Sequence, residues 1–173
     1  MNLFRFTIRK YLLGFDTANL FIQRVEKKSI QLILKKNGAS IGENCDVETG
    51  LIFHNCKNYS NLSIGDNCHI GKNCFFDLRD KITLNDNVVI SMQCTFITHV
   101  DMTKSELSKL YPSLSKKIIL HKNCYIGARA TIHMGVELGE GCIIASNSMI
   151  NRNVAKYTVV GGIPAKLIKN INI

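Results

Sequence analysis

Residues 120–150 read LHKNCYIGARATIHMGVELGEGCIIASNSMI, and a large apolar residue occupies every sixth position of this stretch. The series is Leu120, Ile126, Ile132, Leu138, Ile144 and Ile150. An α-helix repeats its faces about every 3.6 residues and a strand about every two, so neither explains a period of six. A coil with three flat faces does, because each step of six residues supplies one short strand and one corner. The stretch therefore predicts a solenoid of stacked triangular coils.

The same period appears upstream in three shorter runs. Their apolar residues are Ile41, Val47 and Phe53, then Ile64, Ile70 and Phe76, then Leu84, Ile90 and Phe96. Gly follows the apolar residue at several steps, as at Gly65, and Asn often comes two positions later, as at Asn67. We expect both residues at corners, because Gly accepts unusual backbone angles at no steric cost and Asn tolerates the left-handed region.

Six of the seven cysteines share one phase of the repeat. They are Cys45, Cys68, Cys74, Cys94, Cys124 and Cys142. No C-x-x-C pair is present, and free cysteine behaves as a small buried apolar residue. We therefore expect these side chains to fill inner corners rather than to form disulfides or hold a metal. Their odd number and the lack of a secretory signal favour a reducing cytoplasm.

The chain of 173 residues divides into three parts around the repeat. Residues 1–36 mix apolar with basic side chains, which predicts one or two amphipathic helices and no membrane-spanning run. These helices either pack on the stack as a capping unit, which is the favoured arrangement, or make peripheral contact with a membrane surface. Residues 37–152 carry the repeat, and residues 153–173 form a short tail.

The formal net charge is +9, with an isoelectric point near 9.3. Such an excess favours an anionic partner, which includes a phosphorylated cofactor, nucleic acid or a membrane face. The basic residues are spread along the chain, and no nucleic-acid-binding motif accompanies them. Nucleic acid is therefore not expected as a partner.

The repeat contains two interruptions. Two extra residues follow Phe76 and form a bulge around Asp77. A much longer insertion follows Phe96, which predicts an extruded loop at about residues 97–118. A long insertion in an otherwise regular stack favours a functional loop, and this one begins with His99. The other histidines lie at repeat or coil positions and are expected to be ordinary surface residues: His54, His69, His121 and His133.

The repeat, His99 at the start of the loop, residues 123–128 (NCYIGA) and residues 160–166 (VGGIPAK) together resemble the hexapeptide-repeat acyltransferases. The nearest group is that of the maltose and galactoside O-acetyltransferases, and the resemblance covers roughly residues 40–170. It implies an all-β fold, a left-handed parallel β-helix of hexapeptide repeats with an N-terminal helical segment and a short C-terminal tail. It also implies a homotrimer that binds acetyl-CoA as co-substrate between neighbouring subunits, with no metal required.

The chemistry of acetyl transfer agrees with this resemblance. A base must deprotonate the acceptor, and a neutral imidazole suits that task near pH 7. The resemblance assigns this role to His99, and it assigns an oxyanion donor and a cofactor contact to the backbone N–H of Ala128. Asp77 is expected to bind a sugar hydroxyl or to orient His99, although a solvated charged turn accounts for it equally well. Further cofactor contacts, along the pantetheine arm and at the phosphates, are implied for Ser146, Arg152, Lys166 and Lys169.

Three functions stay open on this basis. The preferred one is an acetyl-CoA-dependent O-acetyltransferase acting on a sugar hydroxyl in surface polysaccharide biosynthesis. The second is an N-acetyltransferase of an amino-sugar nucleotide or another amine, with the same fold and donor. The third is a non-catalytic β-helix scaffold, or a metal enzyme of the γ-carbonic-anhydrase kind. A metal enzyme needs three converging histidines, and His99 has no partner at ligand spacing.

Overall fold

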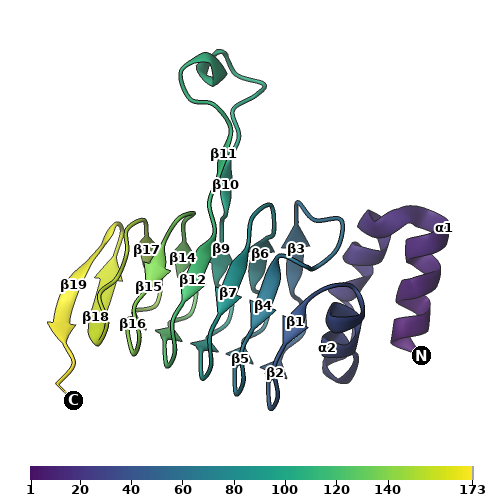
Figure 1. The fold of residues 1–173 in the computed structure, drawn as a ribbon, viewed down its shortest axis with the longest axis horizontal. Helices are drawn as coiled ribbons and strands as arrows, with labels where there is room; N and C mark the ends of the chain where they lie inside the picture. The colour runs from purple at the N-terminus through teal and green to yellow at the C-terminus, as the bar shows by residue number, and fades with distance from the viewer. Residues whose placement is uncertain (173) are drawn as a thin grey trace.

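The computed structural model describes residues 1–172 and shows three sheets of mainly parallel strands arranged as the faces of a triangular prism (Figure 1). The first face contains β1 (Ser40–Ile41), β4 (Leu62–Ile64), β7 (Ile82–Leu84), β12 (Ile118–Leu120) and β15 (Glu137–Leu138). The second contains β2 (Asp46–Val47), β5 (His69–Ile70), β8 (Val89–Ile90), β13 (Tyr125–Ile126), β16 (Ile143–Ile144), β18 (Thr158–Gly162) and β19 (Ala165–Asn170). The third contains β3 (Ile52–His54), β6 (Phe75–Asp77), β9 (Thr95–Phe96), β14 (Thr131–Ile132) and β17 (Met149–Ile150). The predicted solenoid is confirmed.

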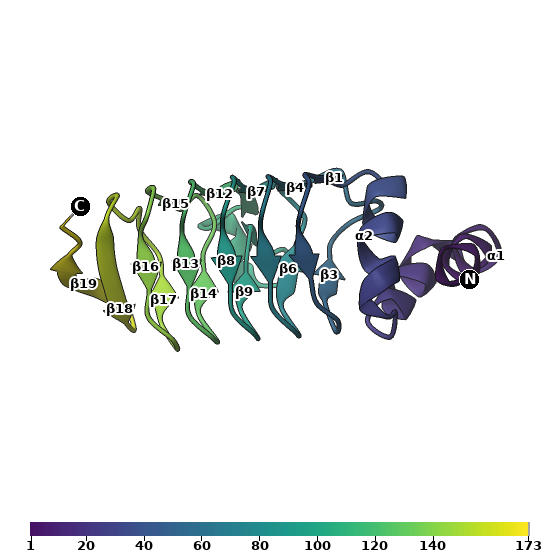
Figure 2. The same cartoon turned by 90° about the horizontal axis from the view of Figure 1, so that it is seen from below.

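The core runs along the axis of the prism, because each coil places its apolar residues in register with those of the next. On the third face, Phe76 stacks between Phe53 and Phe96, with ring centroids 5.6 and 5.0 Å apart. Five of the seven cysteines are buried, and all seven are free thiols. The regular succession of coils is seen along the length of the molecule in Figure 2.

The corners use Gly and Asn for different reasons. Asn67 adopts the left-handed conformation, with φ at 56°, as its position predicts. The same explanation is wrong for Gly127, whose φ is not positive. A Cβ atom there would lie 2.5 Å from the backbone N of Ser146 in the next coil. Gly127 is therefore required because two backbones approach closely, and not because of its backbone angles.

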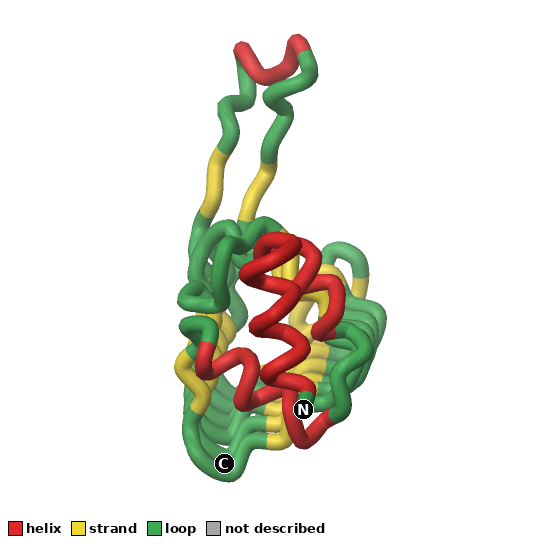
Figure 3. The backbone as a smooth tube through the Cα atoms, turned by 90° about the vertical axis from the view of Figure 1, so that its right-hand side faces the viewer, coloured by secondary structure: helices red, strands yellow, loops and turns green. Residues whose placement is uncertain are grey.

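Two helices cover the N-terminal end of the prism (Figure 3). Helix α1 (Asn2–Ile22) is kinked at Gly14, where φ is 84°, and α2 (Lys27–Lys36) follows it. The kink brings Phe6 against Phe15, and both rings lie within 6.4 Å of the buried ring of Tyr59. The helices thus close the open end of the core. Within residues 1–172, neither helix combines the length and the apolar character that a membrane crossing demands.

The opposite end differs from the expected tail. Strand β18 continues the second face beside β16, and β19 returns antiparallel to it, so the sheet extends well past residue 152. The long insertion forms an antiparallel ribbon of β10 (His99–Val100) and β11 (Leu114–Ser115), with a short 3-10 helix (Glu106–Lys109) beyond it. This hairpin projects from the side of the prism (Figure 1).

Candidate active site

All the extra residues of the β-helix fall at one corner of the prism, where the third face leads back to the first. From the core residue of the third face to the next core residue of the first face, the chain advances 11 residues after Phe53, 8 after Phe76 and 24 after Phe96. A regular coil advances six residues over the same interval. Because consecutive coils stack, the three enlarged corners lie beside one another and bring together residues that are far apart in the sequence. The polar residues that they contribute to one cluster are Asn55, Asp77 and His99.

His99 is held by a carboxylate from the coil beneath it. Its Nδ1 lies 2.6 Å from Oδ2 of Asp77, the last residue of β6. The same oxygen accepts the backbone N–H of Thr98 at 2.8 Å and its hydroxyl at 2.9 Å. A carboxylate only accepts hydrogen bonds, so Nδ1 carries the proton and Nε2 of the neutral ring keeps its lone pair. The pair can therefore serve as a base with a fixed tautomer.

Asp77 is ionised in this arrangement. Its side chain is 2% exposed, and burial by itself would raise its pKa. Hydrogen bonds from His99, Asn55 and Thr98 outweigh burial and hold the pKa below its usual range. Because its acceptor positions are occupied by these internal donors, the geometry favours orientation of His99 over direct contact with a sugar. The solvated-turn explanation is wrong, since the carboxylate is buried.

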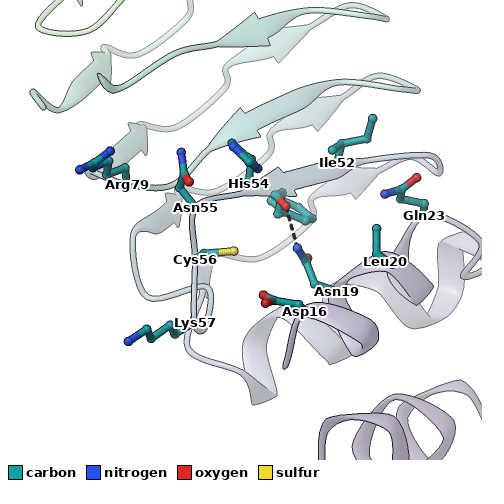
Figure 4. A pocket seen from close by; sticks show the side chains of 11 residues that line it. Asp16, Asn19, Leu20, Gln23, Ile52, His54, Asn55, Cys56, Lys57 and Arg79 are labelled. Atoms are coloured by element: carbon teal, nitrogen blue, oxygen red, sulfur yellow. Dashed lines mark hydrogen bonds between the residues drawn. The ribbon is translucent and has the colours of Figure 1, made fainter. Parts of the chain in front are cut away.

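A cleft of about 650 Å³ is lined by Asn55, which contacts both members of this pair. Figure 4 shows the side chains that line the cleft. It lies between the second half of α1 and the first coils, where Asn19 Nδ2 donates a hydrogen bond of 2.7 Å to the carbonyl of Phe53. Asn55 links the cleft to the pair, because its amide nitrogen donates to Asp77 Oδ1 at 3.0 Å and lies 3.4 Å from Nε2 of His99. The polar residues lining the cleft are Asp16, Asn19, Gln23, His54, Asn55, Lys57 and Arg79.

Arg79 fastens the base of the hairpin to the prism. Its guanidinium donates to Asp101 at 2.9 Å on the outgoing side and to Ser113 at 3.3 Å on the returning side. Hydrogen bonds from the Thr103 hydroxyl and N–H, and from Arg79, lower the pKa of Asp101. Arg79 also lines the cleft, and its backbone N–H donates to Asp77 Oδ1 at 3.4 Å. It therefore ties the hairpin, the carboxylate and the cleft together.

Ala128 lies at a different corner, where β13 of the second face leads to β14 of the third. Its N–H makes no hydrogen bond to any group within residues 1–172, so it is available to an external acceptor. Its carbonyl accepts the N–H of Asn147 at 2.9 Å, which stacks the turn containing Ser146 directly on this corner. A strand of the third face separates this corner from the one that carries His99. One chain therefore does not bring Ala128 and His99 together.

The basic residues expected to contact the cofactor lie at the C-terminal end. Arg152 and Lys166 line a second cleft of about 300 Å³ between the last coil and β19. Lys169 also lies on β19, outside that cleft, and all three side chains are exposed. Ser146 is exposed at the corner that follows β16, in the coil before β18. These residues and Ala128 thus occupy the C-terminal half of the prism.

The sequence did not single out Asn55, Thr98 or Arg79 as site residues. Thr98 precedes His99 directly, but no pattern links it to a carboxylate 21 residues earlier. His54 is exposed, as expected, yet it lines the cleft. Within residues 1–172, no group of three or more His, Cys, Asp or Glu side chains is placed to hold a metal ion.

Comparison with known proteins finds relatives that share the repeat. Residues 61–93 and 117–152 match a family model described as the hexapeptide repeat of succinyl-transferase. The galactoside O-acetyltransferase of Escherichia coli K12 is 29% identical over 154 residues, which are 86% of this chain and 70% of that protein.

Two solved structures share the fold over nearly the whole chain. A hexapeptide-repeat acetyltransferase from Vibrio cholerae superposes with a TM-score of 0.80 at 22% identity, covering 100% of this chain and 94% of the other. A galactoside acetyltransferase in complex with coenzyme A gives 0.78 at 24% identity, covering 99% and 83%. These likenesses confirm the left-handed parallel β-helix.

Proposed function

We propose that the chain is a hexapeptide-repeat acyltransferase that uses acetyl-CoA as co-substrate and acetylates a hydroxyl group of a sugar. Surface polysaccharide biosynthesis in the cytoplasm is the setting that we propose. The observation that carries the proposal is the pair of His99 and Asp77, which Asn55 connects to the cleft. An oriented imidazole next to a pocket with many hydrogen-bonding groups suits an acceptor that is itself a polyol.

The proposed reaction proceeds by direct attack. Nε2 of His99 takes the proton of the acceptor hydroxyl as its oxygen bonds to the thioester carbonyl carbon. The tetrahedral intermediate then collapses, the bond from carbon to sulfur breaks, and the thiolate of CoA receives the proton from the imidazolium. Asp77 remains ionised throughout and stabilises the charged ring, as a buried carboxylate does in catalytic triads. No covalent intermediate on the enzyme is needed.

The oxyanion of the intermediate needs a donor, and we assign this role to the backbone N–H of Ala128. Since His99 and Ala128 lie at separate corners of one chain, the donor that faces His99 comes from Ala128 of the partner subunit. This arrangement requires a homotrimer with three equivalent sites, as the family resemblance implies. The free N–H of Ala128 supports the assignment.

We assign the phosphates of CoA to the C-terminal end of the prism. Arg152 and Lys166 share a cleft, and their charge suits a pyrophosphate or a ribose phosphate. Lys169 is exposed close by on β19, and Ser146 lies between this end and Ala128, where the pantetheine arm passes. The order of these residues along the prism matches an extended cofactor with its thioester at the level of His99.

The acceptor is assigned to the cleft between α1 and the first coils. Its amides and charged groups can bind several sugar hydroxyls, and Asn55 places one of them next to Nε2 of His99. The match to a galactoside O-acetyltransferase over 86% of the chain favours a hydroxyl as the nucleophile over an amine. An amino-sugar acceptor would use the same base and the same donor.

A panel of sugars and amino sugars with acetyl-CoA tests the proposal, with release of free thiol as the measurement. Sugars with free hydroxyls should turn over, and His99→Ala should reduce kcat by roughly 10²- to 10⁴-fold, the usual contribution of a general base. His121→Ala is the matched control, because His121 is a partly exposed histidine on the first face, away from the enlarged corner. Turnover only with amines would refute O-acetylation. Full activity of His99→Ala would refute the mechanism.

A further inference from the structure

The first half of α1 is apolar on two opposite faces. One face packs inward through Phe6, which is buried against the rings of Phe15 and Tyr59. The other face points away from the protein, and its large side chains are all exposed. They recur at helical spacing as Phe4, Ile8, Tyr11 and Leu12. A helix with apolar side chains on both faces needs a partner for the outer one.

The segment that carries this outer stripe is strongly positive. Residues 1–36, which we call the N-terminal cap, contain eight Lys or Arg and two Asp or Glu, so they carry six of the nine net positive charges of the chain. Arg5 is exposed next to the stripe, and Arg9 follows one turn later with its guanidinium 4.2 Å above the ring of Phe21. No acidic residue precedes Asp16. The partner of the stripe therefore has to be apolar and anionic at once.

We propose that the N-terminal cap docks on an anionic lipid bilayer, with the first half of α1 lying in the plane of the interface. The stripe of Phe4, Ile8, Tyr11 and Leu12 enters the boundary between headgroups and acyl chains, and the surrounding cations contact the lipid phosphates. This inference goes beyond the acetyl-transfer reaction. A second copy of the chain fits the stripe less well, because it would bring two caps of the same strong charge together.

Docking in this way also sets the position of the cleft relative to the bilayer. The cap covers one end of the prism (Figure 3), and the second half of α1 supplies Asp16, Asn19 and Gln23 to the cleft wall. The acceptor site therefore lies at the end of the molecule that faces the bilayer. An acceptor held at the membrane reaches this site without leaving the lipid surface.

Flotation of the full chain with lipid vesicles tests the proposal. Vesicles made of equal parts of phosphatidylcholine and phosphatidylglycerol should carry the protein upward in low salt, and vesicles of phosphatidylcholine alone should bind it roughly tenfold less. Leu12→Gln should weaken binding to the mixed vesicles by roughly tenfold, because it removes one large apolar contact. Its matched control is Leu110→Gln on the hairpin, since the two side chains are 76% and 73% exposed.

The outcomes separate the possible partners. Binding that requires the anionic lipid, falls with Leu12→Gln and is unaffected by Leu110→Gln supports the proposal. Wild-type protein that stays unbound with the mixed vesicles overturns it, as does equal weakening by both substitutions. A lower molecular mass of Leu12→Gln in size-exclusion chromatography with light scattering also overturns it, because the stripe would then be a contact between copies. Neither substitution should change acetyl transfer to a soluble acceptor.

Discussion

Asp77→Asn tests the catalytic pair most directly, because it removes a charge while preserving shape. The amide oxygen can take the place of Oδ2, where it still accepts hydrogen bonds from His99 and from both donors of Thr98. The amide nitrogen then faces Asn55 Nδ2 and the backbone N–H of Arg79, which donate to Oδ1 at 3.0 and 3.4 Å in the wild type, so these two hydrogen bonds are lost. We expect the fold to persist and the negative charge behind the imidazole to disappear.

The size of the effect follows from the geometry of the pair. Two unit charges about 4 Å apart interact by roughly 4 kcal/mol at an effective dielectric constant near 20, which is suitable for partly buried sites. The side chain of His99 is 20% exposed and that of Asp77 only 2%, so solvent screens the pair little. The ring is charged only after it has taken the proton, so most of this interaction is lost in the transition state. We therefore expect kcat to fall by roughly 10²- to 10³-fold.

Initial rates of thiol release at saturating acetyl-CoA and acceptor measure this loss. Asp80→Asn is the control, because Asp80 lies in the same bulge and its carboxylate accepts a hydrogen bond from Lys81 N–H, not from His99. The control should retain activity within about threefold of wild type. If Asp77→Asn also stays within threefold while its circular dichroism is unchanged, the carboxylate does not support the base and the reasoning from the 2.6 Å contact fails.

Other consequences of the structure can be measured on the same protein. The depressed pKa of Asp77 gives stability that is complete above its unfolded value, 3.8, and is lost as the pH falls through the lower folded pKa. The gap in melting temperature between wild type and Asp77→Asn should therefore shrink as the pH falls below about 4, and a gap that persists in stronger acid contradicts the assignment. Gly127→Ala should cost about 2 to 4 kcal/mol, roughly 5 to 15 °C in melting temperature, since its Cβ meets the next coil. Because the φ of Gly127 is not positive, Ala without this close contact would be tolerated, so a loss below about 1 kcal/mol would refute the close-approach argument. Phe76→Ala, in the middle of the ring stack, should cost about 3 to 5 kcal/mol in denaturant unfolding, and a loss below 1 kcal/mol would show that the stack closes up.

The period of six predicted the architecture because it reports backbone geometry directly. The hand of the helix came from the family resemblance, since the usual rule for parallel crossovers predicts the opposite one. The extent of the sheet at the C-terminus was missed because the step from Ile150 to Val154 is four residues rather than six. Val160 then resumes the second face six residues later. A strict count therefore ended the repeat one coil too early.

The candidate site could be predicted from the sequence where a residue with suitable side-chain chemistry lies at an interruption of the repeat. His99 begins the longest insertion, so its position marked it. Asp77 was ambiguous, because sequence does not tell which residues of consecutive coils stack when the corners differ in length. Asn55 gave no signal at all, since 44 residues separate it from the ring that it touches. The cleft depends on how α1 packs against the first coils, which amphipathic patterning does not specify.

The concentration of every insertion at one corner has a consequence for how such proteins diversify. Pairing on both sides of the hairpin is unbroken, from Ile82 to Ile118 on one face and from Thr95 to Thr131 on another. The edge that carries the chemistry can consequently lengthen, shorten or exchange its segments while the other two edges keep their spacing. Chimaeras that exchange this edge between relatives should keep the scaffold and acquire the substrate preference of the protein that supplied the edge.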